Sequence, residues 1–167
     1  MKPAADFSVA AYLDALGAGT PAPASGSGAA LCGAIGAALA ELAARVTGDV
    51  AAADELVGLR ARLVALADED AEAYTAFMRT RADAERERTI DVPLAIAEAA
   101  RRVVASARRL VESGKPSVRG DAEAGTELAA AAARVGARLV ELNLKGGDDP
   151  RLARARAAMS LQDDLPL

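Results

Sequence analysis

The sequence predicts an all-α fold, an antiparallel helical bundle of about five main helices in a single domain spanning residues 1–167. Aromatic residues make up only 2% of the chain, whereas sheets favour aromatic and β-branched residues and alanine favours helices. Apolar residues also recur at steps of three and four along several long segments, which is the period of an amphipathic helix. A chain of 167 residues is long enough for one domain with a sizeable core.

The first two helices are expected on either side of a loop of small residues. The first covers residues 8–16, and the loop, residues 21–28, leads into a second helix that ends at Gly48. No charged side chain occurs between residues 15 and 40, but alanine and glycine are too weakly apolar to hold a membrane span, so a central buried helix is expected. Its larger side chains recur at steps of three and four, as Leu31, Ile35, Leu39, Leu42 and Val46, and its small residues Gly28, Cys32 and Gly36 form a row that lets another helix approach closely.

The loop before this second helix is a candidate binding site. Ser25 or Ser27 is expected to be the N-cap. The free backbone N–H groups and the positive end of the helix then face whatever lies beside the loop. An anionic or carbonyl-bearing ligand would suit that end.

The third helix is expected from an Asp49 cap to about residue 81, and one position of its apolar face carries a carboxylate. That face runs through Leu56, Leu59, Leu63, Leu66, then Ala73 or Tyr74, then Phe77. Between Leu66 and Ala73 the next position is Asp70. Burial would raise the pKa of this carboxyl group unless it has a partner, which makes Asp70 a candidate site residue. The alternative is a structural aspartate tied to a helix N-terminus or to an arginine.

The fourth and fifth helices follow a charged stretch. Residues 82–89 either extend the third helix into solvent or form a loop, and the fourth helix is expected to begin at Asp91, with Pro93 in its first turn, and to end at Gly114. Its apolar face is expected to contain Val92, Ile96, Ala100, Val103, Ala107 and Leu110. The fifth is expected to begin at Asp121 and to end at Gly146 and Gly147, with an apolar face of Leu128, Ala132, Val135, Leu139 and Leu142. A short last helix covers residues 149–159.

Two polar residues share the inner side of the fifth helix. Asp121 begins that face, and Asn143 flanks it near the other end. The alternative for Asp121 is an N-cap carboxylate, because aspartate is a favoured cap. Asn143 could likewise satisfy a helix end.

Composition excludes several classes of site. The chain has no histidine, which removes Ser-His and Cys-His pairs and most zinc sites, so no metal site is expected. A net charge of -4 and a pI near 5.0 argue against nucleic-acid binding. The single cysteine, Cys32, lies in an apolar pattern and is expected to be a core residue. The N-terminus lacks the apolar stretch of a signal peptide and no segment predicts a membrane span, so a cytoplasmic protein is expected.

Assembly is predicted from the second helix. An almost uncharged helix needs more cover than three amphipathic neighbours supply. We therefore expect a homodimer.

Several motifs, in this order along the chain, resemble the formiminotransferase-cyclodeaminase family. They are T-P-A-P at residues 20–23 before a Gly/Ser segment, A-A-L-C-G-A at 29–34, L-A-D-E-D-A-E-A-Y at 66–74, V-P-L at 92–94, G-D at 120–121 and N-L at 143–144. The resemblance covers residues 7–144. More narrowly, the chain resembles the single-domain branch of cyclodeaminases and methenyltetrahydrofolate cyclohydrolases.

The resemblance implies an all-helical homodimer that binds a reduced folate in a cleft near the subunit interface. Such proteins release ammonia from 5-formiminotetrahydrofolate or add water to 5,10-methenyltetrahydrofolate, with no cofactor beyond the tetrahydrofolate itself. Asp70 would be the general base or the partner of the cation, and Asp121 the second carboxylate. The residues that would contact the pterin or the glutamate tail are Thr20, Ser25, Gly26, Ser27 and Asn143.

Departures from the family pattern favour the water-adding reaction. The family has a Leu-Pro-Lys loop where this chain has R-T-R-A-D-A-E-R at residues 79–86, and a glycine run where this chain has Ala24-Ser25-Gly26-Ser27. Arg79 or Arg81 could replace the charge of the missing lysine but not its proton transfer. Cyclohydrolase activity is therefore expected over deaminase activity, which remains an alternative. Two other interpretations remain open: a non-catalytic helical dimer, and a metal enzyme that uses carboxylate ligands.

Overall fold

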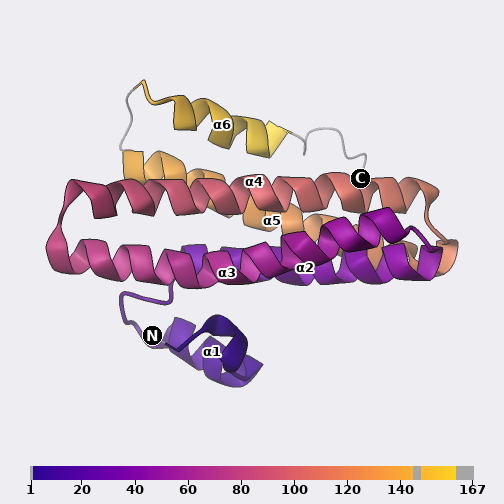
Figure 1. The fold of residues 1–167 in the computed structure, drawn as a ribbon, viewed down its shortest axis with the longest axis horizontal. Helices are drawn as coiled ribbons and strands as arrows, with labels where there is room; N and C mark the ends of the chain where they lie inside the picture. Colours follow the sequence, from indigo (N-terminus) through magenta and orange to yellow (C-terminus); the bar gives the residue numbers. More distant parts are fainter. Residues whose placement is uncertain (1, 145–147, 161–167) are drawn as a thin grey trace.

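Four long helices lie side by side and a short helix flanks them on either side (Figure 1). The computed structural model describes residues 2–144 and 148–160. Within these residues all regular structure is helical, as predicted. The elements are η1 (Ala4–Asp6), α1 (Val9–Gly17), α2 (Ser25–Thr47), α3 (Val50–Thr80), α4 (Asp83–Ser113), η2 (Pro116–Val118), α5 (Arg119–Leu144) and α6 (Pro150–Met159).

The predicted inner faces of α3 and α4 are confirmed. On α3 the leucines of the predicted face are buried, namely Leu56, Leu59, Leu63 and Leu66. On α4 the buried residues include Val92, Ile96, Val103 and Leu110. These large side chains form one core with the small residues of α2 and α5. The period of three and four therefore located the core correctly where the inward side chains are large.

Most large side chains of α2 and α5 are exposed or half-buried. Ile35, Leu42 and Val46 of α2 are 56%, 43% and 42% exposed, and Val135 and Leu142 of α5 are 39% and 53% exposed. Of the apolar face predicted for α5, only Ala132 is buried, Leu128 and Leu139 are half-buried, and the buried Val140 lies outside that face. The second helix is central, as expected, and its buried residues are small, including Gly26, Ala30, Gly33, Gly36, Ala37 and Ala40. The predicted close approach of another helix is confirmed at Gly36.

The physical reason is the close approach of α2 and α5. A Cβ atom added to Gly36 would lie 2.7 Å from the carbonyl oxygen of Gly125, and one added to Gly125 would lie 2.8 Å from that of Gly36. Two backbones this close leave no room for a leucine between them, so the larger residues of α2 and α5 lie away from this contact.

Two predicted helix starts are wrong. Helix α4 begins at Asp83, so residues 83–89 are the first two turns of α4 and Pro93 lies inside the helix. The break from α3 comes earlier because Arg81 has a left-handed backbone, with φ of 56°. Helix α5 begins at Arg119, two residues before Asp121. The predicted end of this helix, at Gly146 and Gly147, falls outside the described residues.

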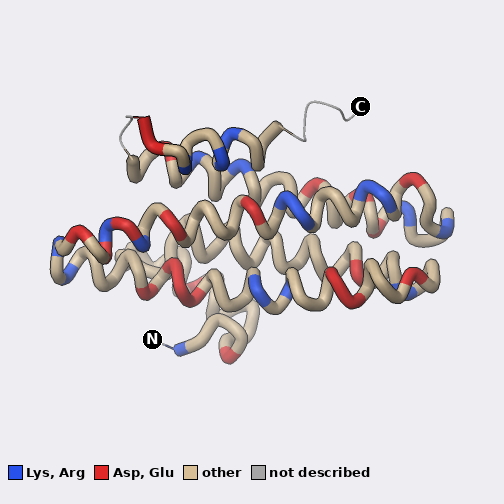
Figure 2. The backbone as a smooth tube through the Cα atoms, turned by 45° about the horizontal axis from the view of Figure 1, so that its top comes forward, with Lys and Arg blue, Asp and Glu red and all other residues tan. Residues whose placement is uncertain are grey.

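Helix α6 covers one end of the α4–α5 pair. Asp149, at the predicted start of this helix, caps it by accepting a hydrogen bond from the backbone N–H of Arg151. The Arg151 guanidinium then pairs with Asp149 and, on α4, with Glu87 and Asp91. Acidic and basic residues also alternate along the long helices (Figure 2).

Helix α2 is the one described helix that is long and apolar enough to cross a membrane by composition. In the most apolar stretch of this helix, 56% of the residues are buried inside the bundle.

Candidate functional site

The carboxylate of Asp70, on α3, lies across the first turn of α2. Its Oδ2 accepts a hydrogen bond of 2.9 Å from the backbone N–H of Ser27. The N-cap residue, Ala24, makes no side-chain cap bond, so the prediction that Ser25 or Ser27 caps this helix is wrong. Asp70 supplies the cap from a different helix, and the interpretation of an aspartate tied to a helix N-terminus is confirmed. The positive end of α2 in turn stabilises the carboxylate.

Gly26 makes room for this carboxylate. A Cβ atom at this position would lie 2.1 Å from Oδ1 of Asp70 and 2.4 Å from its Cγ. An aspartate is too short to move aside without giving up its bond to Ser27. Gly26 therefore belongs to the site because it has no side chain.

The environment of Asp70 favours retention of its proton. Burial raises the pKa of this carboxyl group, and the opposing effect of the hydrogen bonds from Ser27 is smaller. The hydroxyl of Ser27 donates to the carbonyl oxygen of Ala67 over 2.7 Å. While it does so, its one proton cannot also serve the 3.3 Å contact with Oδ2 of Asp70. A protonated Asp70 can donate across that contact, so this residue is suited to exchanging a proton at a higher pH than an ordinary aspartate.

One oxygen of Asp70 remains available. Among the described residues, Oδ1 makes no hydrogen bond, whereas Oδ2 is bonded to Ser27. A bound molecule can therefore accept a proton from Asp70, or lose one to it, without breaking the cap.

An apolar cavity of about 470 Å³ lies between α1 and the outer side of α2. Its walls include Tyr12, Leu13 and Leu16 from α1, Gly28, Leu31 and Ile35 from α2, and Val64 from α3. Gly28 follows Ser27 in the chain, but neither Ser27 nor Asp70 is part of the lining. A mostly apolar cavity of this size with a few polar groups, here Ser8, Tyr12, Cys32 and Arg60, is typical of a small-molecule site.

Tyr12 is a residue of this region that the sequence did not identify as a site residue. Its ring packs edge to face on Phe7, with centroids 5.9 Å apart, and its side chain is one wall of the cavity. The pKa of its hydroxyl is raised, mainly by burial and also by the nearby Asp68 and Asp70. Only its position on the inner side of the first helix could have drawn attention to it.

The loop residues predicted for the site are partly placed there. Ser25 is the first residue of α2 and is exposed, so it lies on the open side of the helix start. Ser27 and Gly26 are buried against Asp70. Thr20 lies farther back in the exposed loop, where its hydroxyl donates to the carbonyl oxygen of Ala22 over 3.2 Å.

Asn143, on α5, stabilises α4 by bonding to one of its backbone carbonyl groups. Its Nδ2 donates to the carbonyl oxygen of Thr89 over 2.6 Å. That carbonyl would normally receive the N–H of residue 93, but Pro93 has none. Asn143 therefore replaces a hydrogen bond inside α4, where the sequence suggested a helix end. Its Oδ1 has no partner among the described residues.

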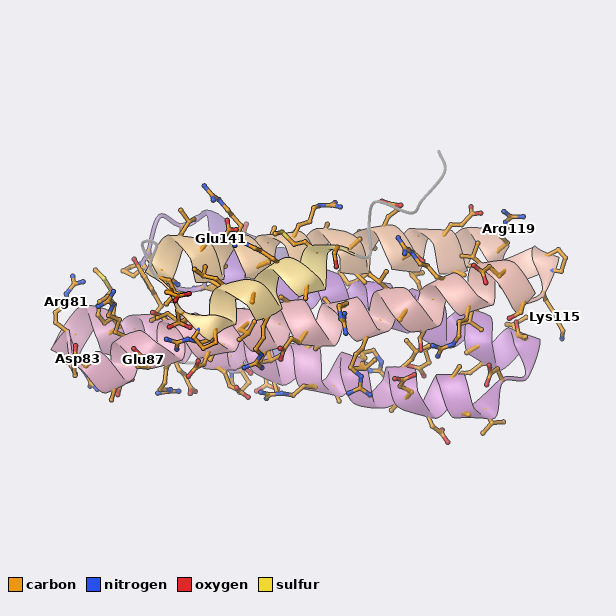
Figure 3. All side chains as sticks on the ribbon, turned by 90° about the horizontal axis from the view of Figure 1, so that it is seen from above. Arg81, Asp83, Glu87, Lys115, Arg119 and Glu141 are labelled. Atoms are coloured by element: carbon orange, nitrogen blue, oxygen red, sulfur yellow. The ribbon has the colours of Figure 1, made fainter. Side chains whose placement is uncertain are left out.

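Asp121 lies far from Asp70 within one chain. It is in the first turn of α5, and that end of α5 follows Lys115, whose N–H donates to Thr47 at the end of α2. Arg119 and Lys115 lie at one end of the molecule, and Arg81 and Asp83 lie at the other (Figure 3). The next turn of α5, at Gly125, contacts Ala40, about 21 Å along α2 from Gly26 at 1.5 Å per residue. The two predicted carboxylates are not brought together within one chain.

Among residues 2–144 and 148–160, no group of three or more cysteine, aspartate or glutamate side chains is arranged to hold a metal ion.

Comparisons with known proteins agree with this architecture. The family model for formiminotransferase-cyclodeaminase matches residues 8–160. The chain is 29% identical to the methenyltetrahydrofolate cyclohydrolase of Methylorubrum extorquens, over 92% of this chain and 86% of the relative. Its structure is similar to that of formiminotetrahydrofolate cyclodeaminase from Thermotoga maritima, with a TM-score of 0.81, 22% identity, and coverage of 95% of this chain and 89% of that one. The family match spans most of the chain and its motifs lie at the start of α2 and on α3, so the protein belongs to the formiminotransferase-cyclodeaminase family.

Proposed function

We propose that this protein is a cytoplasmic folate one-carbon enzyme that hydrolyses 5,10-methenyltetrahydrofolate to 10-formyltetrahydrofolate. The observation that carries the proposal is the Asp70 carboxyl group, held at the start of α2 with one oxygen free and close to Tyr12, whose side chain is a wall of the apolar cavity. The name of the Methylorubrum extorquens relative, which aligns over 92% of this chain, supports the choice of substrate. No cofactor beyond the tetrahydrofolate of the substrate is required.

The chemistry suits a carboxylate. The methenyl bridge is a cation, so its carbon is already electrophilic, and an ionised Asp70 stabilises the charge and accepts a proton from the attacking water. The tetrahedral carbon that forms between N5 and N10 then loses its bond to N5, which takes up a proton. The cation itself lowers the pKa of Asp70 when it binds, which offsets the effect of burial.

The substrate would lie in the cavity with its reacting end at Asp70. The flat pterin ring fits apolar walls, and the exposed Ser25 and the first N–H groups of α2 can bind its polar edge or the glutamate tail. The free Oδ1 of Asn143 could accept a hydrogen bond from a ring N–H, and Thr20 could contact the tail from the loop. These contacts of Thr20, Ser25, Gly26, Ser27 and Asn143 are part of the proposal.

Release of ammonia from 5-formiminotetrahydrofolate is the second candidate reaction. It is favoured by the same burial that raises the pKa of Asp70, because a departing amine needs a proton donor. The chain lacks the lysine of the family's Leu-Pro-Lys loop, and Arg79 and Arg81 cannot donate a proton. The water-adding reaction therefore remains our first choice.

We also propose that the protein works as a homodimer. The outer faces of the neighbouring helices α2 and α5 carry exposed Ile35, Leu42, Val46, Val135 and Leu142, and large apolar side chains on neighbouring helices suit contact with a second copy of the chain. A second copy packed with its α2 antiparallel would bring Asp121 of the partner subunit towards the end of α2 that holds Asp70. In this arrangement Asp121 could act as the second carboxylate. Nucleic acid and membranes are not part of the proposed function.

The reaction is tested by following the absorbance of the methenyl compound. Purified protein should accelerate its decay well above the buffer rate, with 10-formyltetrahydrofolate as the product. A protein that leaves this rate unchanged but forms the methenyl compound from 5-formiminotetrahydrofolate would be the deaminase. Failure of both reactions, without protection from heat by a reduced folate, would indicate a non-catalytic helical module.

A further inference from the structure

The hydroxyl of Tyr12 is buried, and no described residue makes a hydrogen bond of normal length and angle with it. Tyr12 is only 8% exposed, and a buried tyrosine hydroxyl usually has a partner. A buried donor without an acceptor costs free energy. Such an exception in a folded protein calls for an explanation, and a role in function is one of the established explanations.

The neighbouring Ser27 has the opposite deficit. Its hydroxyl proton is directed to the carbonyl oxygen of Ala67 at 2.7 Å, so the lone pairs of its oxygen are open to a donor. The Ser27 side chain lies close enough to the Tyr12 hydroxyl to interact with it. A donor without an acceptor therefore lies next to an acceptor without a donor.

Helix α1 is attached in a way that allows the two groups to meet. Tyr12 is the one buried residue of α1, and α1 stands away from the four long helices (Figure 1). Val9 and Leu13 of the same helix are 79% and 60% exposed. Leu16 is half-buried over Gly28, so a small local adjustment at Tyr12 is enough to redirect the hydroxyl towards Ser27 without disturbing the core.

We propose that Tyr12 is a positioning residue for Asp70, with its O–H donating to the Ser27 oxygen that a protonated Asp70 would otherwise use. This proposal rests on the proposed function for its catalytic meaning, but the contact itself belongs to the free protein. A hydroxyl oxygen that already accepts from Tyr12 is a weaker acceptor for the proton of the Asp70 carboxyl group, so donation from Tyr12 favours the ionised form of Asp70. The tyrosine thereby keeps the buried carboxylate able to accept a proton from water.

Few charged groups surround Tyr12 and Asp70, so the effect of Tyr12 on the pKa of Asp70 can be measured. Asp68 and Asp70, both on α3, are the ionisable groups that act on Tyr12, and Asp68 is bonded to the backbone N–H of Ala4. Lys2 lies over the Phe7 ring. From α2 only Ser27 acts on Asp70, and no charged side chain of α4 or α5 among the described residues contributes to its shift.

The test is a titration of Asp70 in Tyr12→Phe, a variant that loses only the hydroxyl. Carbon-13 NMR of the aspartate carboxyl groups, with the Asp70 signal assigned from Asp70→Asn, gives the pKa in the ligand-free protein. We expect the pKa of Asp70 to rise by about half a unit or more. The variant should stay folded and become slightly less stable to heat, because one buried hydrogen bond is lost. Tyr74→Phe is the matched control, since that ring is 40% exposed, and it should leave the pKa of Asp70 unchanged.

Turnover then separates this proposal from the proposed function. In an active enzyme, the acid limb of the pH profile of kcat/KM should move to higher pH in Tyr12→Phe by the same amount as the carboxyl titration. An unchanged pKa of Asp70 in Tyr12→Phe would overturn the role of Tyr12, whether or not the wild type is active. A shifted pKa in a wild type that turns over neither folate would confirm the contact and overturn the proposed function alone.

Discussion

At the scale of single residues, the site depends on Gly26, which has no side chain and therefore leaves room for the Asp70 carboxylate. Gly26→Ala would place a Cβ atom 2.1 Å from Oδ1 of Asp70, so Asp70 must rotate and release Ser27. We expect a loss of about 1–3 kcal/mol in the free energy of unfolding, measured by urea denaturation. Gly58→Ala is the matched control: Gly58 lies on α3 with nothing within 4 Å of its added Cβ, and this change should stabilise the helix by about 0.5–1 kcal/mol. Equal effects of the two changes would contradict the contact.

The ionisation of Asp70 has a defined sign in the stability of the protein. Burial raises the pKa of Asp70 above its ordinary value of 3.8, so the folded state binds more protons than the unfolded chain between the two pKa values. Ionisation of Asp70 therefore removes stability as the pH rises from 3.8 through the folded pKa, and the loss is complete above it.

Asp70→Asn exposes this effect because asparagine still accepts from Ser27 but cannot ionise. Relative to the wild type, the variant should become more stable as the pH rises through that window, as measured by urea unfolding at a series of pH values. The other carboxylates with shifted pKa values, including Glu41 and Glu55, are present in both proteins and cancel. A difference in stability that stays constant with pH would show that Asp70 is not perturbed.

At the scale of the helices, Asn143 links α5 to the hydrogen bond that Pro93 removes from α4. Asn143→Leu leaves the carbonyl oxygen of Thr89 unpaired, at a cost of about 1–3 kcal/mol. Pro93→Ala restores an N–H at that position, so the same Asn143→Leu change should cost less in the Pro93→Ala background. A double-mutant cycle by denaturant unfolding measures this coupling. Additive effects would mean that the bond between Asn143 and Thr89 does not stabilise the protein.

Helix type and order could be predicted from sequence, but two inner faces and two helix starts could not. The period located the core faces of α3 and α4 because their inward side chains are large leucines, isoleucines and valines. It failed for α2 and α5 because the contact between them is made by glycine and alanine. Hydrophobic periodicity follows the largest side chains, and here these are displaced outward by the close approach of two backbones.

The site residues also fall into two groups: some can be identified from a local sequence pattern, and others depend on long-range contacts. Asp70 could be found because it interrupts an apolar face, and its placement beside the Ser25–Ser27 segment agrees with the sequence hypothesis. Its partner could not be deduced, because a cap supplied from residue 70 to residue 27 is a long-range contact. A local rule predicts Pro93 in the first turn of a helix. Pro93 instead lies inside α4, where Asn143 replaces the hydrogen bond that proline cannot make. The role of Tyr12 depends on an unpaired atom, which only a structure reveals.

At the scale of the whole molecule, the exposed outer faces of α2 and α5 lead us to expect two copies of the chain in solution. Sedimentation equilibrium should give twice the 16.9 kDa mass of one chain. Ile35→Glu places a charge on the centre of this surface and should shift the mass towards that of one chain. Val50→Glu is the matched control, because Val50 is 70% exposed at the start of α3, and it should leave the mass unchanged. A monomeric wild type would contradict the proposed dimer and the shared role of Asp121.

The central claim is that one carboxyl group, Asp70, carries the chemistry of a folate enzyme. The most direct measurement compares the decay of methenyltetrahydrofolate absorbance with wild type, Asp70→Asn and Asp54→Asn, the last being an exposed aspartate on the same helix. We predict that wild type and Asp54→Asn accelerate the decay equally and that Asp70→Asn, while still folded, loses at least about a hundredfold in rate, as expected for removal of a general base. Full activity of Asp70→Asn would contradict the claim.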